Sequence, residues 1–200
     1  STPRSSSAAS DVYKRQRAPN GGGWGDWTAP VYCPKGTFAV GYGIRIESDQ
    51  GGNKDDTSAN AVRLKCADIF TTEEHTITPH PGYWGGWSDQ RCSQGSNVPG
   101  RFLSGYRIRV EGNQGNGDDT AMNALEMQCY TSYNIKAHNG FWGSWGSWDY
   151  CPEGQVINGL RVRVESGQGS GDDTALNDVQ FYCAPLFTTF KTSLKNVNSN

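Results

Sequence analysis

Acidic side chains recur in three copies along this chain of 200 residues, and their types suit chemistry on glycosidic bonds. Each copy carries an Arg-x-Glu segment and, further on, two neighbouring aspartates followed by Thr. The glutamates are Glu47, Glu111 and Glu165, and the second aspartates are Asp56, Asp119 and Asp173. Paired carboxyl groups can protonate a glycosidic oxygen and stabilise an oxocarbenium-like transition state. These six residues are therefore candidates for carbohydrate binding, and a catalytic assignment stays unknown because the sequence does not fix their separation.

A structural interpretation competes for the same residues and is the favoured one. Arg45, Arg109 and Arg163 each lie two positions before the glutamate, so the pair shares one strand face and can form an exposed ion pair. Asp and Thr in tight turns hydrogen-bond to their own backbone. A calcium loop needs six or more oxygens at alternating positions, which the Asp-Asp-Thr segments lack. No metal and no cofactor are expected.

Tryptophan is the second residue type with binding chemistry, because its flat ring can stack on the apolar face of a sugar. All seven Trp lie in or beside three W-G-x-W segments, at 24–27, 84–87 and 142–145. Their strict register with the strands favours a structural role, in which Trp fills or caps the core and Gly permits close backbone approach. Trp148, followed by Tyr150, has no counterpart among the Trp of the other copies and is the better candidate for a sugar contact.

The elements around these residues recur in the same order three times. Each W-G-x-W segment is followed by a Cys, an alternating strand that ends in Arg-x-Glu, the polar turn, and a second strand that ends in Cys. Apolar and polar residues alternate with period two, as in Ile44-Arg45-Ile46-Glu47. This pattern predicts an all-β chain of antiparallel sheets, each with one apolar face. Three such sheets would turn their apolar faces to a common axis, since no single repeat can bury its face alone.

The six cysteines form no C-x-x-C pair, so disulfides are favoured over a zinc site. The first and last strands of each unit should be neighbours in one sheet, which predicts disulfides within repeats. The expected pairs are Cys33–Cys66, Cys92–Cys129 and Cys151–Cys183. Disulfides indicate an oxidising compartment, and the chain is interpreted as a mature secreted product.

Charge and composition exclude several classes of function. Eighteen basic residues nearly balance twenty acidic ones, which argues against a nucleic-acid surface. No apolar run approaches the ~20 residues of a membrane span. The three His (His75, His80 and His138) are placed outside the repeat and lack metal-ligand spacing.

The repeated motifs resemble those of the vitelline membrane outer layer protein I family. The residues that carry the resemblance are the W-G-x-W segments, Cys33-Pro34-Lys35-Gly36, Cys151-Pro152-Glu153-Gly154 and the run from Gly171 to Asn177. The resemblance spans roughly residues 19–184. It implies a β-prism of three Greek-key sheets with pseudo-three-fold symmetry. It also implies secretion, residence in an extracellular coat of eggs or in mucosal fluid, and affinity for chito-oligosaccharides.

The expected organisation is one domain with different ends. Residues 1–17 are Ser-rich and basic and are expected to be a disordered leader or an appended segment. Residues 18–184 form the prism, with repeats at about 18–70, 78–133 and 138–184. Residues 185–200 form a C-terminal tail.

Three functions remain open. The leading one is a secreted coat or mucosal-fluid protein that is not an enzyme and binds glycans or other matrix and coat proteins. The alternative is a weak transglycosylase or hydrolase acting on N-acetylglucosamine oligomers through clustered Glu and Asp. The third is a purely structural coat component with no small ligand.

Overall fold

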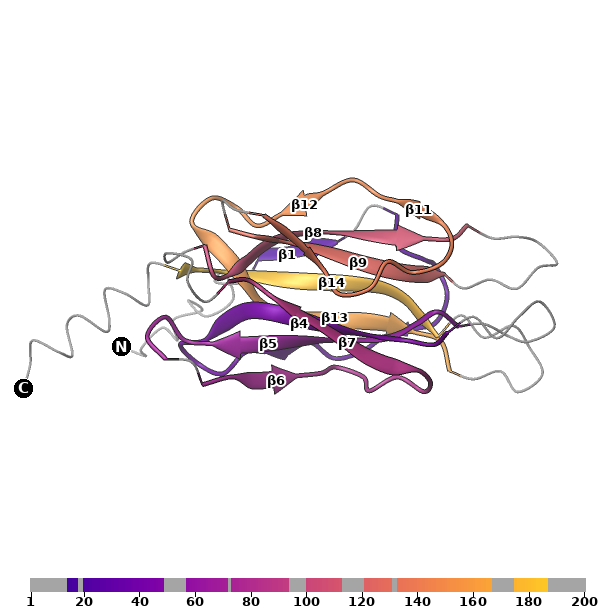
Figure 1. Ribbon diagram of the computed structural model, residues 1–200, viewed down its shortest axis with the longest axis horizontal. Coiled ribbons are helices and arrows are strands. Elements are labelled where there is room, and N and C mark those ends of the chain that lie inside the picture. Colours follow the sequence, from indigo (N-terminus) through magenta and orange to yellow (C-terminus); the bar gives the residue numbers. More distant parts are fainter. Residues whose placement is uncertain are drawn as a thin grey trace, which may run out of the picture.

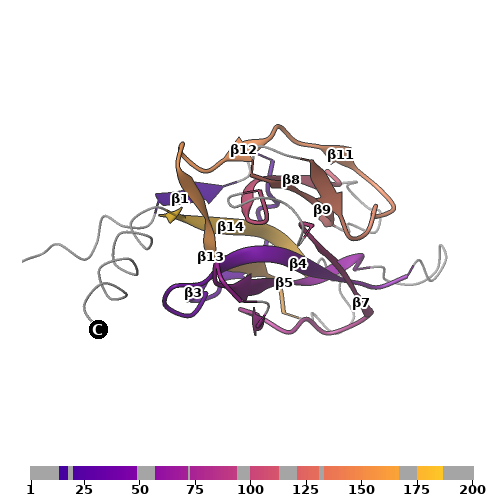
Figure 2. The same ribbon diagram turned by 60° about the vertical axis from the view of Figure 1, so that its left-hand side comes forward.

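The computed structural model describes residues 14–17, 20–48, 57–71, 73–93, 100–112, 121–130, 133–166 and 175–186, with the backbone alone at 14–17. These residues form fourteen strands in three antiparallel sheets that stand around one long axis (Figures 1 and 2). The all-β chain predicted from the repeats and the β-prism implied by the resemblance are both confirmed.

Each sheet has two long central strands and shorter strands at its edges. The first sheet has the order β6 (His75–Ile77), β5 (Ala59–Ala67), β4 (Phe38–Ile46) and β7 (Gly86–Arg91). The second has β10 (Asn134–Lys136), β9 (Met122–Cys129) and β8 (Leu103–Val110), with β11 (Ser144–Trp145) and β12 (Asp149–Tyr150) both pairing with β8. The third has β1 (Lys14–Arg17), β14 (Leu176–Pro185) and β13 (Gln155–Val164), with β2 (Asp26–Trp27) and β3 (Val31–Tyr32) on β13.

The edge strands are exchanged between repeats. The W-G-x-W segment that opens each repeat pairs with the central strand of another repeat: β7 with β4, β11 and β12 with β8, and β2 and β3 with β13. The last of these pairings joins the start of the prism to its end. The ring of three sheets is therefore closed by backbone hydrogen bonds as well as by packing.

A difference of one residue decides whether the exchanged edge strand is continuous. Six positions separate Trp27 from Cys33 and Trp145 from Cys151, but only five separate Trp87 from Cys92. In the two longer copies the edge strand is broken into two pieces, whereas β7 runs unbroken over Gly86–Arg91. Pro30 and Trp148 lie in the two breaks, each three residues before the Cys.

The apolar faces of the three sheets meet along the axis. Tyr106 and Phe181 pack edge to face with ring centroids 4.5 Å apart and join the second and third sheets. The hydroxyl of Tyr42 donates to the carbonyl of Leu125 at 2.5 Å and accepts from the N–H of Ala137 at 2.8 Å. Burial of this hydroxyl raises the pKa of Tyr42 far above its usual range. The first and second sheets are thus tied by a hydrogen bond inside the core.

The prediction that Trp fills the core is wrong. Every Trp side chain is exposed or half-buried, and the large core side chains are Tyr, Phe, Ile, Leu and Met. The reason is the strand exchange, which places the second Trp of each motif on the outer face of a neighbouring sheet.

The ends of the domain also differ from expectation. Residues 14–17 form strand β1, which pairs with β14 from Lys14↔Cys183 to Arg17↔Gln180. The leader boundary predicted at residue 17 is therefore wrong for its last four residues, and residues 1–13 lie outside the described part. Strand β14 continues to Pro185, and Leu186 is buried.

Candidate functional site

The three candidate glutamates follow the three long strands that end at the same end of the prism (Figure 1). Glu47 follows β4, Glu111 follows β8 and Glu165 follows β13. The backbone N–H of each glutamate donates to a carbonyl, that of Ser58, Ala121 or Ala175, at 2.8 Å in all three sheets. Residues 58, 121 and 175 all have positive φ, so the three strand ends have the same backbone conformation and hydrogen bond at this point. One carboxylate oxygen of Glu47 also accepts from the Thr57 hydroxyl at 2.7 Å.

The arginines two residues earlier hold the adjacent loops. Arg45 donates to the carbonyls of Gly85 and Pro81, each at 3.0 Å. Arg109 donates to the carbonyls of Gly143 at 3.0 Å and Asn139 at 3.1 Å. Arg163 donates to the carbonyl of Gly25 at 2.8 Å. Their hydrogen bonds run to loop backbone, so the ion pair along the strand predicted from Arg-x-Glu is not their main role.

The first Gly of each W-G-x-W motif brings its loop against the strand end that carries the glutamate. Gly25, Gly85 and Gly143 have φ between 72° and 82°. A Cβ at Gly85 would lie 2.1 Å from the carbonyl oxygen of Ile46 and 2.4 Å from the N–H nitrogen of Glu47. The close approach predicted for these glycines is confirmed. Because the first Trp of each motif directly precedes its Gly, it lies one residue from the contact with the glutamate backbone.

Two of the three loops carry an aromatic pair with at least one exposed ring. Tyr83 and Trp84 have ring centroids 5.2 Å apart and are 40% and 39% exposed. Phe141 and Trp142 repeat this geometry at 5.2 Å. In the remaining loop the position before Trp24 is Gly23, and Trp24 is 53% exposed.

Two histidines belong to these loops, contrary to the prediction that all His lie outside the repeat. The Nδ1 atom of His80 accepts from the N–H of Gly82 at 3.1 Å, and that of His138 accepts from Gly140 at 3.0 Å. Burial lowers the pKa of both rings. The signal was present in the sequence as H-x-G-[YF]-W-G at 80–85 and 138–143, with Asn20 at the matching place in the other copy.

Buried asparagine side chains accept hydrogen bonds from the loop backbone. Asn60, Asn123 and Asn177 are fully buried. The side-chain oxygen of Asn60 accepts from the N–H of Trp84 at 3.1 Å, and that of Asn123 accepts from Trp142 at 3.1 Å. These amides fix the backbone of the first Trp in two motifs, in line with the structural role expected for the turn segments.

Of the other predicted binding residues, only Trp148 lies in the described part of the chain. Asp56, Asp119 and Asp173 lie outside the described residues. Within the described part of the chain, no group of three His, Cys, Asp or Glu side chains is arranged to hold a metal ion. Trp148 lies in the break between β11 and β12, on the outer face of the second sheet, with its ring centroid 5.8 Å from that of Tyr150.

An Arg packed on a Trp recurs on all three outer faces. Arg161 lies 4.6 Å from the ring centroid of Trp27, Arg107 lies 4.9 Å from that of Trp145, and Arg63 lies 4.2 Å from that of Trp87. Arg161 and Arg107 come from the central strands β13 and β8. In the first sheet the equivalent position is Gly43, and Arg63 reaches over it from β5. The first sheet therefore has the same Arg–Trp contact as the other two, but its Arg comes from the neighbouring strand.

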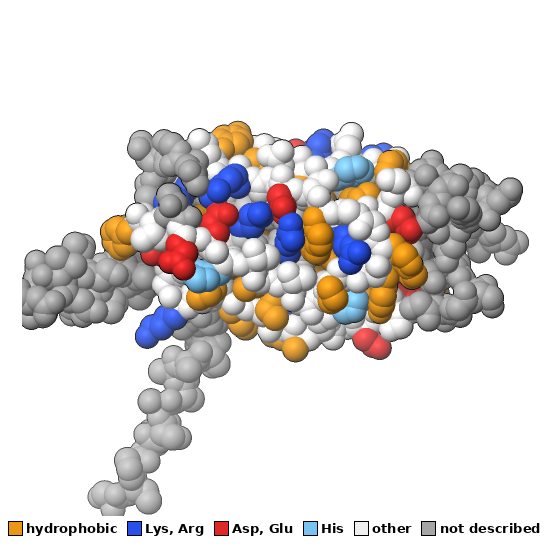
Figure 3. Space-filling model, turned by 60° about the horizontal axis from the view of Figure 1, so that its bottom comes forward, with side chains coloured by type: hydrophobic (Ala, Val, Ile, Leu, Met, Phe, Trp, Pro, Cys, Tyr) orange, Lys and Arg blue, Asp and Glu red, His pale blue; other side chains and the backbone are white. Residues whose placement is uncertain are grey.

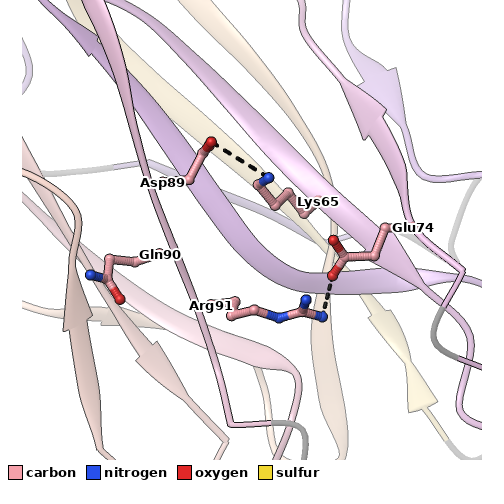
Figure 4. A pocket seen from close by; sticks show the side chains of 5 residues that line it. All are labelled: Lys65, Glu74, Asp89, Gln90 and Arg91. Carbon is pink, nitrogen blue, oxygen red and sulfur yellow. Dashed lines mark ion pairs between the residues drawn. The ribbon is translucent and has the colours of Figure 1, made fainter.

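The outer face of the first sheet carries several charged side chains. Figure 3 shows cationic and anionic side chains alternating in a row across this side of the molecule. A hollow of about 150 Å³ on it is lined by Lys65, Glu74, Asp89, Gln90 and Arg91 (Figure 4).

The charges in this hollow are already paired. Glu74 pairs with Arg91, and Asp89 pairs with Arg63 at 2.6 Å and Lys65 at 3.5 Å. Burial alone would raise the pKa of Asp89, but the hydrogen bond and charge of Arg63, aided by Lys65, outweigh it and lower the pKa. This arrangement stabilises the sheet edge and offers no unpaired charge to a ligand.

Comparison with known proteins gives the family. The model of the family vitelline membrane outer layer protein I matches residues 14–183 and, a second time, residues 134–200. The chain belongs to this family. The vitelline membrane outer layer protein 1 homolog of Homo sapiens is 37% identical over 166 residues, which cover 82% of this chain and 79% of that protein. The Mus musculus homolog is 36% identical over 166 residues, covering 82% and 80%.

Solved structures share the fold of this family member. Calystegia sepium agglutinin gives a TM-score of 0.51 at 13% identity and covers 87% of this chain and 97% of the agglutinin. A single-chain recombinant jacalin gives 0.50 at 11% identity, with coverages of 90% and 97%. The V. cholerae biofilm matrix protein Bap1 gives 0.50 at 13% identity, covering 90% of this chain and 25% of Bap1. In the described residues, no helix is long and apolar enough to span a membrane.

Proposed function

We propose that this protein is a secreted structural protein of an extracellular coat or mucosal fluid that binds glycans such as chito-oligosaccharides. The binding site is the end of the prism where Glu47, Glu111 and Glu165 follow the central strands. The observation that carries the proposal is the exposure of aromatic rings in the loops packed against these strand ends.

Exposed aromatic rings beside carboxylates suit a sugar. The ring face covers the apolar C–H face of a pyranose, and the carboxylate accepts hydrogen bonds from its hydroxyl groups. The loops are fixed by Arg45 and Arg109, by buried asparagines and by glycine contacts with the strand ends. Such preorganised rings lose little freedom on binding.

The extracellular setting is supported by the three disulfides and by family membership. An agglutinin and a biofilm matrix protein are among the proteins with this fold. These likenesses agree with a protein that acts in a matrix.

The test is a titration with a chito-oligosaccharide of six sugars, followed by tryptophan fluorescence. The variant Trp84→Ala/Trp142→Ala removes one ring from each aromatic pair. We expect affinity to fall about tenfold or more, the factor that corresponds to about 1.4 kcal/mol. Trp27→Ala, which removes a half-buried ring from the outer face of the third sheet, is the matched control and should bind as the unaltered chain does.

The same mixture, analysed after long incubation, tests the enzymatic alternative. New oligomers that disappear in Glu47→Gln, Glu111→Gln or Glu165→Gln would favour glycosyl transfer or hydrolysis. Binding with no new oligomers supports the proposed function, and no binding to the unaltered chain overturns it.

A further inference from the structure

The outer face of the second sheet carries one aromatic ring, that of Trp148, that the fold does not require. Trp148 occupies the break between β11 and β12, and the matching break in the third sheet holds Pro30. The first sheet has no such break, because β7 is continuous. At this position the second sheet has Trp148, the third has Pro30, and the first has no break at all, so the sheet architecture does not depend on a Trp there.

Trp148 is half-buried, and its ring stacks with a neighbouring aromatic ring. Its ring lies nearly parallel to that of Tyr150, at an interplanar angle of 15°. Tyr150 is 48% exposed and is seated over Gly105, where a Cβ would come within 2.4 Å of the ring. The guanidinium of Arg107 lies over two Trp rings, 4.9 Å from the centroid of Trp145 and 5.0 Å from that of Trp148.

The polar groups beside these rings carry balanced charge. Lys136, Glu126 and Arg107 lie opposite one another on the adjacent strands β10, β9 and β8. Glu126 accepts from Nε of Arg107 at 2.7 Å and pairs with it at 2.6 Å. Asp149 lies between Trp148 and Tyr150 in the sequence and accepts from the N–H of Tyr150 at 3.0 Å. Two cations and two anions give no net charge, which disfavours polyanions and polycations as ligands.

We propose that Trp145, Trp148 and Tyr150 form a second, lateral binding site for a neutral saccharide chain on the outer face of the second sheet. The ligand class rests on the proposed function, but the site is separate from the end of the prism. A neutral sugar matches aromatic rings beside charges that balance, because its C–H face covers the rings and its hydroxyl groups reach the neighbouring polar groups. Two sites on one molecule would let it join glycan chains in a matrix.

The third sheet provides a matched control within the same molecule. It repeats Arg161 on Trp27, with Arg161 bonded to Gln180 at 2.7 Å, and it seats Tyr32 over Gly159 as Tyr150 sits over Gly105. It lacks a counterpart of Trp148. Trp148→Pro therefore copies an arrangement that this fold already contains, and it should leave the melting temperature unchanged.

The experiment follows the indole N–H signals of the assigned Trp residues by NMR during titration with a chito-oligosaccharide of six sugars. We expect the signals of Trp145 and Trp148 to shift along one saturable curve, while that of Trp27 stays in place. In Trp148→Pro and in Trp148→Ala the shift of the Trp145 signal should be lost, while shifts of Trp84 and Trp142 at the end of the prism persist.

The outcomes separate the two proposals. If Trp84 and Trp142 respond while Trp145 and Trp148 do not, the lateral site is overturned and the proposed function stands. If only Trp145 and Trp148 respond, the lateral site is supported and the end of the prism is not the binding site. The lateral site is also overturned if the Trp145 curve is unchanged in both variants, or if no indole signal responds to the saccharide.

Discussion

The disulfide between Cys33 and Cys66 joins two different sheets of the prism. Cys33 follows β3 at the edge of the third sheet, and Cys66 lies in β5 of the first sheet. Cys92–Cys129 joins the first sheet to the second in the same way, and Cys151–Cys183 joins the second to the third. The three bonds form a closed ring of covalent links around the axis.

We expect removal of one link, in Cys33→Ala/Cys66→Ala, to lower the free energy of unfolding by about 2–4 kcal/mol. The reason is that the bond spans 33 residues and restricts the unfolded chain. Urea unfolding under non-reducing conditions measures the change. An unchanged midpoint and slope would show that backbone pairing alone holds the third sheet against the first.

The cysteine pairs could be predicted from the repeat, but the reason for them could not. The sequence places Cys33 and Cys66 at the two ends of one unit, which suggested neighbouring strands of one sheet. Strand exchange is invisible in the alternation of apolar and polar residues, because an edge strand has the same pattern whichever sheet it joins. The same exchange explains why the Trp residues were wrongly placed in the core.

Asn123 of the second repeat connects all three repeats inside the protein. Its side-chain oxygen accepts from the Ser58 hydroxyl at 2.9 Å and from the N–H of Trp142 at 3.1 Å. We expect Asn123→Ala to lower the free energy of unfolding by about 1–3 kcal/mol, because it leaves buried donors without an acceptor. Asn134→Ala, at an exposed position in β10, is the control and should change stability little. Equal losses in both variants, measured by urea unfolding, would contradict this role.

The stability of the loops should depend on pH through His80 and His138. Burial holds the pKa of both below the ordinary 6.5, and each neutral Nδ1 accepts a glycine N–H. As the pH falls, the unfolded chain takes up protons on these residues before the folded protein does. The contribution to stability is therefore complete above pH 6.5 and is lost as the pH falls through the folded-state pKa.

Thermal unfolding between pH about 7.5 and about 5 measures this loss. We expect His80→Asn/His138→Asn, which copies Asn20 of the remaining loop, to flatten the decrease of melting temperature on the acid side. His75→Asn changes an exposed residue of β6 and should keep the dependence of the unaltered chain. A double variant with the original pH profile would show that other groups cause the decrease.

The candidate site was only partly visible in the sequence. The three glutamates could be named from the repeat, and the strand directions place them at one end of the prism. The roles of their neighbours were not visible, because Arg45 bonds to carbonyls of a loop about 40 residues away in the chain. In the second and third sheets the Arg that packs on Trp comes from the central strands β8 and β13, whereas in the first sheet it is Arg63 of β5. This difference could not be predicted either, since it depends on the space above Gly43.

Adjacent glycines give a final prediction about the loops of the W-G-x-W motifs. Gly85 has a φ of 82°, and a Cβ there would lie 2.1 Å from the carbonyl oxygen of Ile46, whereas nothing lies within 4 Å of a Cβ at Gly86. We expect Gly85→Ala to cost at least about 1–2 kcal/mol, because a left-handed backbone disfavours Ala and the clash is with fixed backbone. The loop should then separate from β4 and carry Trp84 away from Glu47, which would weaken saccharide binding at this end. Gly86→Ala has neither problem, so its unfolding curve and its saccharide titration should match those of the unaltered chain. If both variants lose stability equally, the close contact with Ile46 is not what selects glycine at position 85.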